Sequence, residues 1–522
     1  MDNLLLVIPA IKKNAVIPDQ LVRKLNGVTL FQRAINTALD ITNKILVVTD
    51  SEEISLICDR NGINFYKDKD LRLNSENILE IIYSIVKSYK EDNIFLYRAN
   101  TPLVDSEILK DAYATFKRDS LKILMSVKSN NKNIFFMEND TLKPIERDVS
   151  YVELKAFYIF SKKNLALKDF KPYILDSEKC IEIESYQDWW VCEKILRRKR
   201  IVFNVIWYSR IGIGHIYRSL TIAKEINDHE IIFVCDEKYN FAVNNIASKY
   251  HKVFSSSNVL KTILDLKPDL VINDCLNNDE MYIHSLKNAN VKIVSFEDIS
   301  ESSRYVDLVF NELFEIPQKD GKNYFWGHKY TLLRDEFDDA KRNDNFKNVN
   351  SILLSFGGSD PNNLTLKALK SILKICMQYE LKINIVCGSA YAYEEELKDF
   401  IANCKYKNIF LFINSVAMSK IMEECQIAIS SNGRTAYELA DMHIPTIVIS
   451  HHEREATHTF TSLQNGFINL GIFDKKTAIK LEEKFKKLVE DIDYRELLFN
   501  NIKKYDFRSN KNKVISKILE LL

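Results

Sequence analysis

The residues best suited to chemistry lie in the segment 209–218, which reads Ser-Arg-Ile-Gly-Ile-Gly-His-Ile-Tyr-Arg. A strand-like run precedes this segment and a helix-like run follows it. Gly212 and Gly214 would let such a turn bring backbone N–H groups and a helix N-terminus close to a phosphate. His215 in the same turn could move a proton or activate water near neutral pH. The pattern therefore predicts a phosphate cradle with a built-in base, although two glycines in a strand-to-helix turn are also common in purely structural loops.

Two further turns after apolar runs have the composition of phosphate-binding loops. Residues 355–361 read Ser-Phe-Gly-Gly-Ser-Asp-Pro, and residues 430–438 read Ser-Ser-Asn-Gly-Arg-Thr-Ala-Tyr-Glu. The second segment could donate hydrogen bonds to a pyrophosphate, while its final glutamate accepts them from ribose hydroxyls. The nucleotide-binding candidates in these two loops are Gly357, Gly358, Ser359, Asn432, Gly433, Arg434, Thr435 and Glu438. The histidine-rich segment 451–458 has metal-like content, but its spacing favours a polar cleft wall over a zinc site.

The first 198 residues contain no histidine, so their candidate groups are cations and carboxylates. Lys12 and Lys13 follow the first strand-like run and suit a triphosphate, although a solvated loop would explain them as well. Arg98 follows another apolar run in the same way. Glu182 and Glu184 would share one face of a strand and could bind Mg²⁺; the alternative is an edge strand with a solvated acidic face. Metal-assisted nucleotidyl transfer fits this composition better than imidazole catalysis.

Alternating strand-like and helix-like runs must position these groups. They predict an α/β fold with mostly parallel sheets, in which ligands lie at the C-terminal ends of the strands. One series fills residues 1–198. Two more follow residue 200 and are separated by the polar stretch 335–350, which predicts two Rossmann-like lobes, residues 199–340 and 341–522, with a cleft between them.

Composition limits the classes of partner. Lysine plus arginine (73) nearly balance aspartate plus glutamate (72), so no global field favours nucleic acid or an anionic membrane. No apolar run reaches 18 residues, so no membrane insertion is expected. The nine cysteines are scattered without a paired motif, which favours free thiols in a reducing cytoplasm.

The first half resembles the CMP-sialic acid synthetases, also called acylneuraminate cytidylyltransferases. The similarity lies in residues 7–10 (Val-Ile-Pro-Ala), 17–27, 48–54 and 101–103 (Thr-Pro-Leu). It implies CTP as a substrate and Mg²⁺ at Glu182 and Glu184, where the family carries Asp-x-Asp. The sequence departs from the family at Ile11 (usually Arg), at residues 12–16 (usually Gly-Gly-Ser-Lys-Gly) and at Arg98 (usually Gln).

The second half resembles the UDP-sugar hydrolase of the pseudaminic acid pathway and its spore-coat polysaccharide relatives. Four segments carry the similarity in the family's order: 212–218, 327–337, 355–365 and 432–438. The resemblance implies a GT-B fold, no cofactor, and water attack that releases UDP from a 2,4-diacetamido-2,4,6-trideoxy sugar. It also implies that His215 is the general base, and we group Arg218 with it as a catalytic candidate. The family's Arg-x-Asp before the turn is absent from residues 205–210.

Both resemblances belong to one route, from a UDP-activated diacetamido sugar to a CMP-activated nonulosonic acid. The sequence therefore predicts a cytoplasmic bifunctional enzyme whose partners are nucleotide sugars and CTP, with a homodimer as a further hypothesis. Two alternatives stay open at this point. The second half could be a glycosyltransferase that uses the same cleft and histidine, and the first half could be a non-catalytic binding module.

Overall fold

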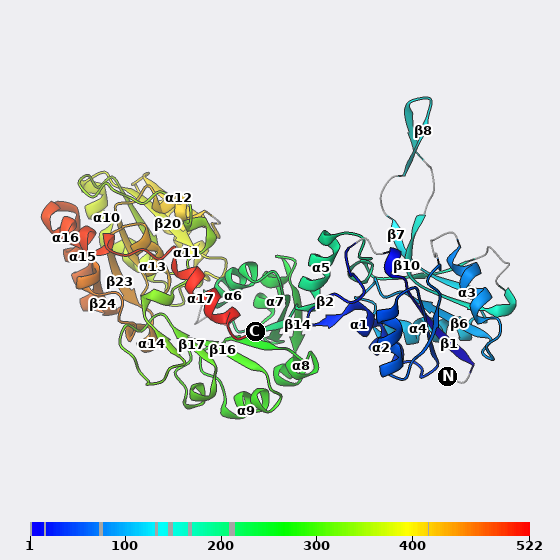
Figure 1. Cartoon of the computed structure of the whole chain (residues 1–522). Coiled ribbons are helices and arrows are strands. Elements are labelled where there is room, and N and C mark those ends of the chain that lie inside the picture. Colours follow the sequence, from blue (N-terminus) through cyan, green and yellow to red (C-terminus); the bar gives the residue numbers. More distant parts are fainter. Residues whose placement is uncertain are drawn as a thin grey trace. The chain divides into compact units, whose positions relative to one another are not determined.

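The computed structural model describes residues 3–14, 17–71, 77–130, 134–144, 150–164, 170–207, 214–415 and 417–522. It divides into two compact units, Met1–Arg198 and Lys199–Leu522 (Figure 1). Each large sheet has a separate hydrophobic core on either face, because helices cover both sides. In the part of the chain that is described, no helix is both long and apolar enough to cross a bilayer.

The N-terminal unit is built on a seven-stranded sheet with the order β11-β7-β10-β6-β1-β4-β5. Strand β10 runs antiparallel to its two neighbours, and the other pairs are parallel. The strands are β1 (Leu4–Ala10), β4 (Ile45–Thr49), β5 (Asn64–Lys67), β6 (Asn93–Tyr97), β7 (Ile123–Asn130), β10 (Ser150–Ser161) and β11 (Lys171–Ile174). Two small hairpins pair β2 (Lys24–Leu25) with β3 (Val28–Thr29), and β8 (Phe135–Glu138) with β9 (Thr141–Pro144).

The described residues of the N-terminal unit form five α-helices: α1 (Leu30–Leu39), α2 (Glu52–Arg60), α3 (Ile78–Val86), α4 (Ser106–Arg118) and α5 (Tyr186–Leu196). Four of them begin where a short polar side chain accepts a hydrogen bond from a backbone N–H of the first turn. The capping residues are Thr29, Ser51, Asp105 and Ser185. Such caps satisfy N–H groups that have no partner inside the helix, so they fix where each helix starts.

The first lobe of the C-terminal unit is a parallel sheet with the order β14-β13-β12-β15-β16-β17-β18. Its strands are β12 (Arg200–Val205), β13 (Glu230–Asp236), β14 (Lys252–Ser256), β15 (Leu270–Asp274), β16 (Lys292–Phe296), β17 (Leu308–Asn311) and β18 (Tyr324–Trp326). Its helices are α6 (Gly214–Glu225), α7 (Asn240–Ala247), α8 (Val259–Asp265) and α9 (Glu280–Asn288).

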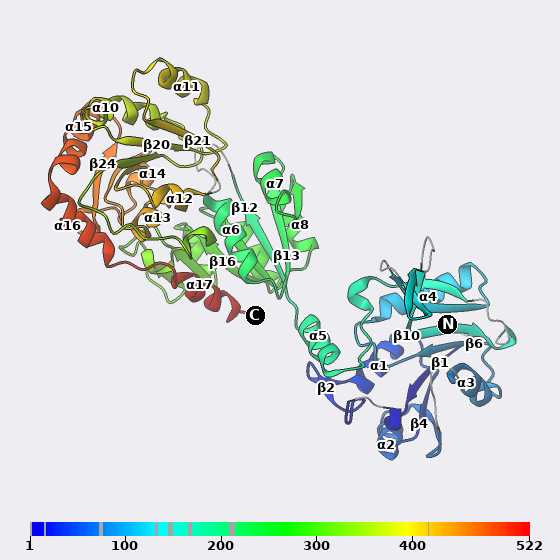
Figure 2. The same ribbon diagram turned by 90° about the horizontal axis from the view of Figure 1, so that it is seen from above.

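The second lobe is a parallel six-stranded sheet with the order β21-β20-β19-β22-β23-β24. Figure 2 shows β20, β21 and β24 of this lobe. Its strands are β19 (Ser351–Ser355), β20 (Lys382–Cys387), β21 (Ile409–Ile413), β22 (Ile427–Ser430), β23 (Thr446–Ser450) and β24 (Phe467–Ile472). Its helices are α10 (Leu364–Gln378), α11 (Glu394–Asn403), α12 (Met418–Met422), α13 (Thr435–Asp441), α14 (Glu453–Ala456), α15 (Lys475–Glu490) and α16 (Ile492–Lys503).

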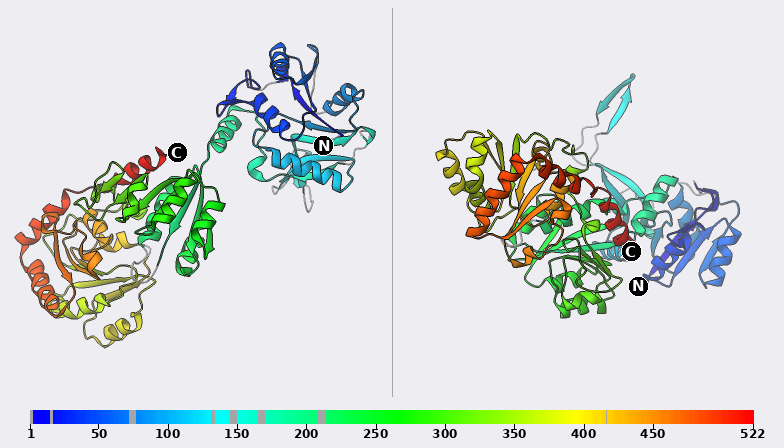
Figure 3. Two further views of the ribbon diagram at one scale, coloured as in Figure 1. Left: turned by 90° about the horizontal axis from the view of Figure 1, so that it is seen from below. Right: turned by 90° about the vertical axis from the view of Figure 1, so that its left-hand side faces the viewer.

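The last helix, α17 (Asn510–Leu519), returns to the first lobe, as both views of Figure 3 show. Val514, Ile515 and Ile518 join the core that contains Ile201 and Phe203 of β12. The chain therefore crosses between the two lobes twice, and this double connection holds them as one unit.

The strand orders explain where function is expected. In each sheet the first strand of the series, β1, β12 or β19, lies between a strand that follows soon after it and one that follows later. Loops on the two sides of such a switch point diverge and leave a crevice at the C-terminal ends of the strands. The α/β class and the mostly parallel sheets predicted from the sequence are confirmed.

Candidate active site

His215 forms a tight pair with Asp274 in the first lobe. It lies in the first turn of α6, which follows β12, while Asp274 is the last residue of β15, the other strand of the switch point. The two side chains are 6% and 0% exposed, and Nδ1 of His215 lies 2.5 Å from Oδ1 of Asp274. Because a carboxylate can only accept, the proton of the neutral imidazole is assigned to Nδ1. The Nε2 atom is thereby left as an acceptor, which is the form that a general base requires.

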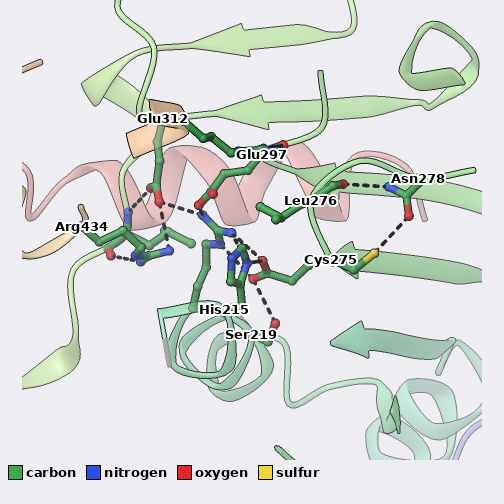
Figure 4. Close-up of polar contacts among 12 residues, drawn as sticks. His215, Ser219, Cys275, Leu276, Asn278, Glu297, Glu312 and Arg434 are labelled. Carbon is green, nitrogen blue, oxygen red and sulfur yellow. Dashed lines mark hydrogen bonds and ion pairs between the residues drawn. The ribbon is translucent and has the colours of Figure 1, made fainter. Parts of the chain in front are cut away.

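Arg218 lies one turn after His215 on the same face of α6 and is fully buried. Figure 4 shows His215 near the side chains of Glu297, Glu312 and Arg434. The Nε of Arg218 donates to Oδ2 of Asp274 at 2.9 Å. Its Nη1 donates to Glu297 at 2.7 Å and to Glu312 at 2.8 Å. Burial alone would raise the pKa of Asp274, but the charge of Arg218 and the hydrogen bonds from Arg218 and His215 outweigh it and hold that pKa well below its usual range. Asp274 therefore stays ionised and keeps the imidazole in the basic tautomer.

The cluster extends to the second lobe through Arg434. Its Nη1 lies 3.0 Å from Oε1 of Glu312, and its Nη2 donates to the carbonyl of Leu332 at 2.8 Å. A Cβ on Gly214 would lie 3.2 Å from Cδ of Arg434, so a side chain at Gly214 would crowd this arginine. Arg434 thus links a predicted nucleotide loop to the residues that hold His215.

A pocket of about 250 Å³ lies between the two lobes and is open to His215. Nine of the predicted site residues line it: Gly214, His215, Gly357, Gly358, Ser359, Gly433, Arg434, Thr435 and Glu438. The loops after β19 and β22 therefore meet the first turn of α6 at this pocket. Arg218 does not line the pocket but holds Asp274 through hydrogen bonds. Gly212 lies outside the described residues.

The second-lobe candidates differ in what their side chains can do. Gly357 has φ +83°, a conformation that favours glycine, so the loop after β19 requires it. The side-chain amide of Asn432 donates to the carbonyls of Glu455 and His458, which leaves only its backbone for a pyrophosphate. Glu438 lines the pocket but already forms a two-point ion pair with Arg334, at 2.8 and 3.0 Å. A ribose hydroxyl would have to share this carboxylate.

The histidine-rich segment 451–458 also reaches the pocket, through His451, His452 and His458. The Nε2 of His451 lies 3.0 Å from the carbonyl of Phe356, and Nδ1 of His458 lies 2.7 Å from the carbonyl of Asn432. Both rings therefore tie together the loops that form the pocket wall.

In the N-terminal unit, Lys12 and Lys13 lie after β1 but are engaged with other residues. Their backbone N–H groups donate to the two carboxylate oxygens of Asp50, at 2.7 and 3.1 Å. The Lys12 ammonium contacts Glu53 at 2.8 Å and Asp19 at 3.1 Å, and the Lys13 ammonium donates to the carbonyl of Lys69. A triphosphate would have to compete with these contacts.

The strand predicted around Glu182 and Glu184 is wrong, because residues 181–184 join no sheet. A single backbone bond, from Ile183 N to Asn100 O at 2.8 Å, ties the segment to the loop after β6. The alternation still holds, since Ile183 is buried between two glutamates that are not. One backbone hydrogen bond can hold an extended segment in place, but it does not make the segment a strand of a β-sheet.

Arg98 lies beside Glu182, with Nη1 3.3 Å from Oε1. Asn100 donates to the same oxygen at 2.8 Å, while its own Oδ1 is buried with no partner among the described residues. Glu184 is more open, with a side chain 62% exposed and 3.7 Å from Lys155. The structure therefore brings Arg98 and Glu182 together and leaves Glu184 at the rim.

Three acidic residues of the cluster were not predicted from the sequence: Asp274, Glu297 and Glu312. Each is the last residue of a strand or the first after it, at the ends of β15, β16 and β17. Acidic residues directly after apolar runs were the available signal. The rule that ligands lie at the C-terminal ends of parallel strands would have selected all three.

Comparisons with known proteins agree with the resemblances predicted for both halves of the sequence. Residues 18–162 match the MobA-like NTP transferase domain. The uncharacterized protein MJ1062 of Methanocaldococcus jannaschii is 32% identical over 262 residues, which are 47% of this chain and only about half (54%) of that protein. The pseudaminic acid cytidylyltransferase and UDP-2,4-diacetamido-2,4,6-trideoxy-beta-L-altropyranose hydrolase of Helicobacter pylori is 23% identical over 84% of each chain.

Two further matches concern the second half. The UDP-2,4-diacetamido-2,4,6-trideoxy-beta-L-altropyranose hydrolase of Campylobacter jejuni is 27% identical over 43% of this chain and 82% of its own. The crystal structure of Acinetobacter baumannii MurG aligns with 62% of this chain and 99% of its own, at 13% identity and a TM-score of 0.44. The sequence comparisons confirm both resemblances seen in the motifs, and the chain is a nucleotidyltransferase-like α/β domain followed by two lobes that are each built on a parallel sheet.

Proposed function

We propose that the C-terminal unit hydrolyses a UDP-activated 2,4-diacetamido-2,4,6-trideoxy sugar to the free sugar and UDP, and that the N-terminal unit activates a nonulosonic acid with CTP. The observation that carries this proposal is the buried His215–Asp274 pair at a pocket whose other walls are glycine-rich loops. The similarity of 84% of the chain to the bifunctional Helicobacter pylori protein supports the pairing of the two activities.

In the proposed hydrolysis, Nε2 of His215 takes a proton from water as the water oxygen attacks the anomeric carbon. The bond from that carbon to the β-phosphate oxygen breaks, and its electron pair leaves with UDP. Asp274 stabilises the imidazolium that forms, because its carboxylate already accepts from Nδ1. The backbone groups of the loops at Gly357 and Gly433 are placed to face the departing pyrophosphate.

Arg218 acts through Asp274 and is therefore a positioning residue. Its guanidinium bonds to Asp274, Glu297 and Glu312, which are provided by three different strand ends. A buried guanidinium that is shared in this way fixes the carboxylate opposite His215. We expect a substitution of Arg218 to disturb the orientation of His215, while His215 itself remains present as the base.

For the N-terminal unit, the residues at Glu182 fit Mg²⁺. The buried Oδ1 of Asn100 has no hydrogen-bond partner among the described residues, and it belongs to the residue that contacts the Glu182 carboxylate. Oxygen donors of these two kinds are those that Mg²⁺ prefers. When bound, the ion would neutralise charge on the triphosphate of CTP. Arg98, beside the same carboxylate, would contact the nucleotide or hold Glu182 in place.

The test is to incubate the full chain with a UDP-2,4-diacetamido-2,4,6-trideoxy sugar and to measure UDP. We expect release by the wild type without any added acceptor, and a loss of about 10³-fold or more in His215→Ala. His284→Ala, which removes an exposed histidine of α9, should behave as wild type. Unchanged turnover in His215→Ala would overturn the assignment of the base. UDP release only when an acceptor sugar is present would favour the glycosyltransferase instead.

The second activity needs its own assay, CTP-dependent release of pyrophosphate with a panel of nonulosonic acids. The Arg98–Glu182 pair favours one rival, because a carboxylate already held by arginine could serve a non-catalytic binding module. Absence of pyrophosphate release beside intact UDP release would support that rival.

A further inference from the structure

We infer that Glu297 is a further catalytic residue of the proposed hydrolysis: one oxygen of its carboxylate faces the sugar and stabilises the positive charge that develops at the anomeric carbon. This inference rests on the proposed function of the C-terminal unit. It assigns a role to a pocket residue that the motif analysis did not select.

The backbone holds Glu297 in an uncommon conformation at the pocket wall. It follows β16 directly and has φ +57°, in the left-handed region that non-glycine residues rarely occupy. Its N–H donates to the carbonyl of Phe310 at 2.9 Å, and its carbonyl accepts from Arg454 at 3.1 Å. Strain of this kind persists where the surrounding structure fixes it, and it is concentrated at functional sites.

The two carboxylate oxygens of Glu297 have different surroundings. Oε1 accepts from Nη1 of Arg218 at 2.7 Å, and no described residue donates to Oε2. The residue is 7% exposed and lines the same pocket as His215. Burial alone would raise the pKa of Glu297, but the charge of Arg218 outweighs it and lowers the pKa to about 2. The pocket therefore contains a carboxylate that is ionised and has a free acceptor.

Carboxylates and guanidinium groups are packed together in the cluster before the reaction starts. Three carboxylates (Asp274, Glu297 and Glu312) surround Arg218 and Arg434, and the guanidinium of Arg454 reaches the carbonyl of Glu297. A buried carboxylate oxygen without a donor is costly unless a positive charge meets it. The reaction supplies positive charge at two places, on His215 as it accepts a proton and on the anomeric carbon as its bond to UDP weakens. The cluster is thus preorganised for the transition state.

Glu312 offers a matched control within the same cluster. Its carboxylate accepts from the same Nη1 of Arg218, at 2.8 Å against 2.7 Å for Glu297. It is 1% exposed, does not line the pocket, and also contacts Arg434 at 3.0 Å. The two glutamates lie equally close to Arg218. A difference in kcat between Glu297→Gln and Glu312→Gln therefore measures the effect of the carboxylate oxygen that faces the substrate.

The covalent chemistry is unchanged by this role. Water forms the new bond to the anomeric carbon, the electron pair of the broken bond leaves on the β-phosphate oxygen of UDP, and the water proton passes to His215. Glu297 forms no bond to carbon and contributes its charge as the bond to UDP lengthens. This role makes kcat, and not the affinity for UDP, the quantity that Glu297 controls.

The first experiment compares Glu297→Gln with Glu312→Gln in the full chain. For Glu297→Gln we expect kcat of UDP release to fall about 100-fold with the Kd of UDP unchanged. For Glu312→Gln we expect a smaller fall in kcat and weaker UDP binding, because Arg434 loses its partner. Equal losses of kcat in both variants would overturn the inference and leave the hydrolase intact. If the wild type releases no UDP, the proposed function fails, and the inference fails with it.

A second experiment uses the wild type and does not depend on the variants folding. An iminosugar with a protonated ring nitrogen carries positive charge beside the anomeric position, whereas the free sugar product does not. In the presence of UDP, we expect the iminosugar to bind about 10-fold or more tightly than the neutral sugar. Equal affinity would overturn the inference. In Glu297→Gln the preference should be lost, and in Glu312→Gln it should be kept.

Discussion

The two candidate sites differ in how firmly their charged groups are held. Asp274 accepts from His215, Arg218 and Ser219, and its side chain is fully buried. By contrast, Glu184 is 62% exposed and lies 3.7 Å from a single lysine. The first arrangement is preorganised, so its geometry exists before substrate arrives. The second offers oxygen atoms that a ligand must still order, and we therefore expect the two sites to respond differently to the same type of change.

The largest effect is expected from Asp274→Asn. The amide can donate to Nδ1 of His215, which favours the tautomer with its proton on Nε2 and removes the base. UDP release should fall by about 10³-fold or more, as expected when the partner of a catalytic histidine is neutralised. The measurement is the initial rate of UDP release at saturating substrate.

Asp441→Asn is the matched control for this change. Asp441 is also fully buried and is also held by two arginines, Arg342 at 2.8 Å and Arg508 at 3.1 Å, but it does not line the pocket. Its loss should lower stability and leave the turnover of the folded protein within a few-fold of wild type. An equal loss in both variants would mean that Asp274 supports the fold and not the base.

The sequence was sufficient for the sheets and for the glycine loops, because both have local signals. Apolar runs alternate with amphipathic helices, and glycine marks turns such as the one at Gly357. The ends of β15, β16 and β17 are far apart in sequence and are brought together only by the strand order. Asp274, Glu297 and Glu312 each end or directly follow an apolar run, which marks them as candidates, but that local signal does not show which strand ends become neighbours.

The strand predicted around Glu182 was wrong for a different reason. Its alternation of polar and apolar residues is genuine, and Ile183 is buried as the pattern requires. Periodicity describes which side chains are buried, however, and it does not show whether a partner strand is present. The pairing of Arg98 with Glu182 was also out of reach, because 84 positions of sequence separate the two residues.

The second prediction concerns metal dependence, in which the two sites should differ. Chelation of divalent cations, or Glu182→Gln, should lower CTP-dependent pyrophosphate release about 100-fold, because charge neutralisation on the triphosphate is lost. UDP release should stay unchanged under both conditions. Glu178→Gln is the control, since it removes the same charge from a side chain that is 63% exposed and paired with Arg198. Loss of UDP release on chelation would contradict the comparison.

Arg98→Gln tests how the metal site is tuned. The guanidinium lies 3.3 Å from Glu182, so it shares the carboxylate and repels a cation brought to it. Its removal should lower the Mg²⁺ concentration that gives half-maximal pyrophosphate release by about 3- to 10-fold, as expected for one partly screened charge. A Mg²⁺ requirement that stays the same or rises would show that Arg98 supports the site instead.

The smallest effect is expected in the acid unfolding of the C-terminal unit. The pKa of Glu297 is lowered from its ordinary value of 4.5 to about 2, so its contribution to stability is present above pH 4.5 and is lost as pH falls towards 2. Glu297→Gln should remove this dependence and make the decline shallower by up to about 1.4 kcal/mol per pH unit in that window. The slope is measured by urea unfolding of the full chain at several pH values. The unfolding transition of the C-terminal unit is the one that UDP shifts. Identical slopes would show that Glu297 is not held as an ion, and the contrast with the site at Glu182 would then rest on Asp274 alone.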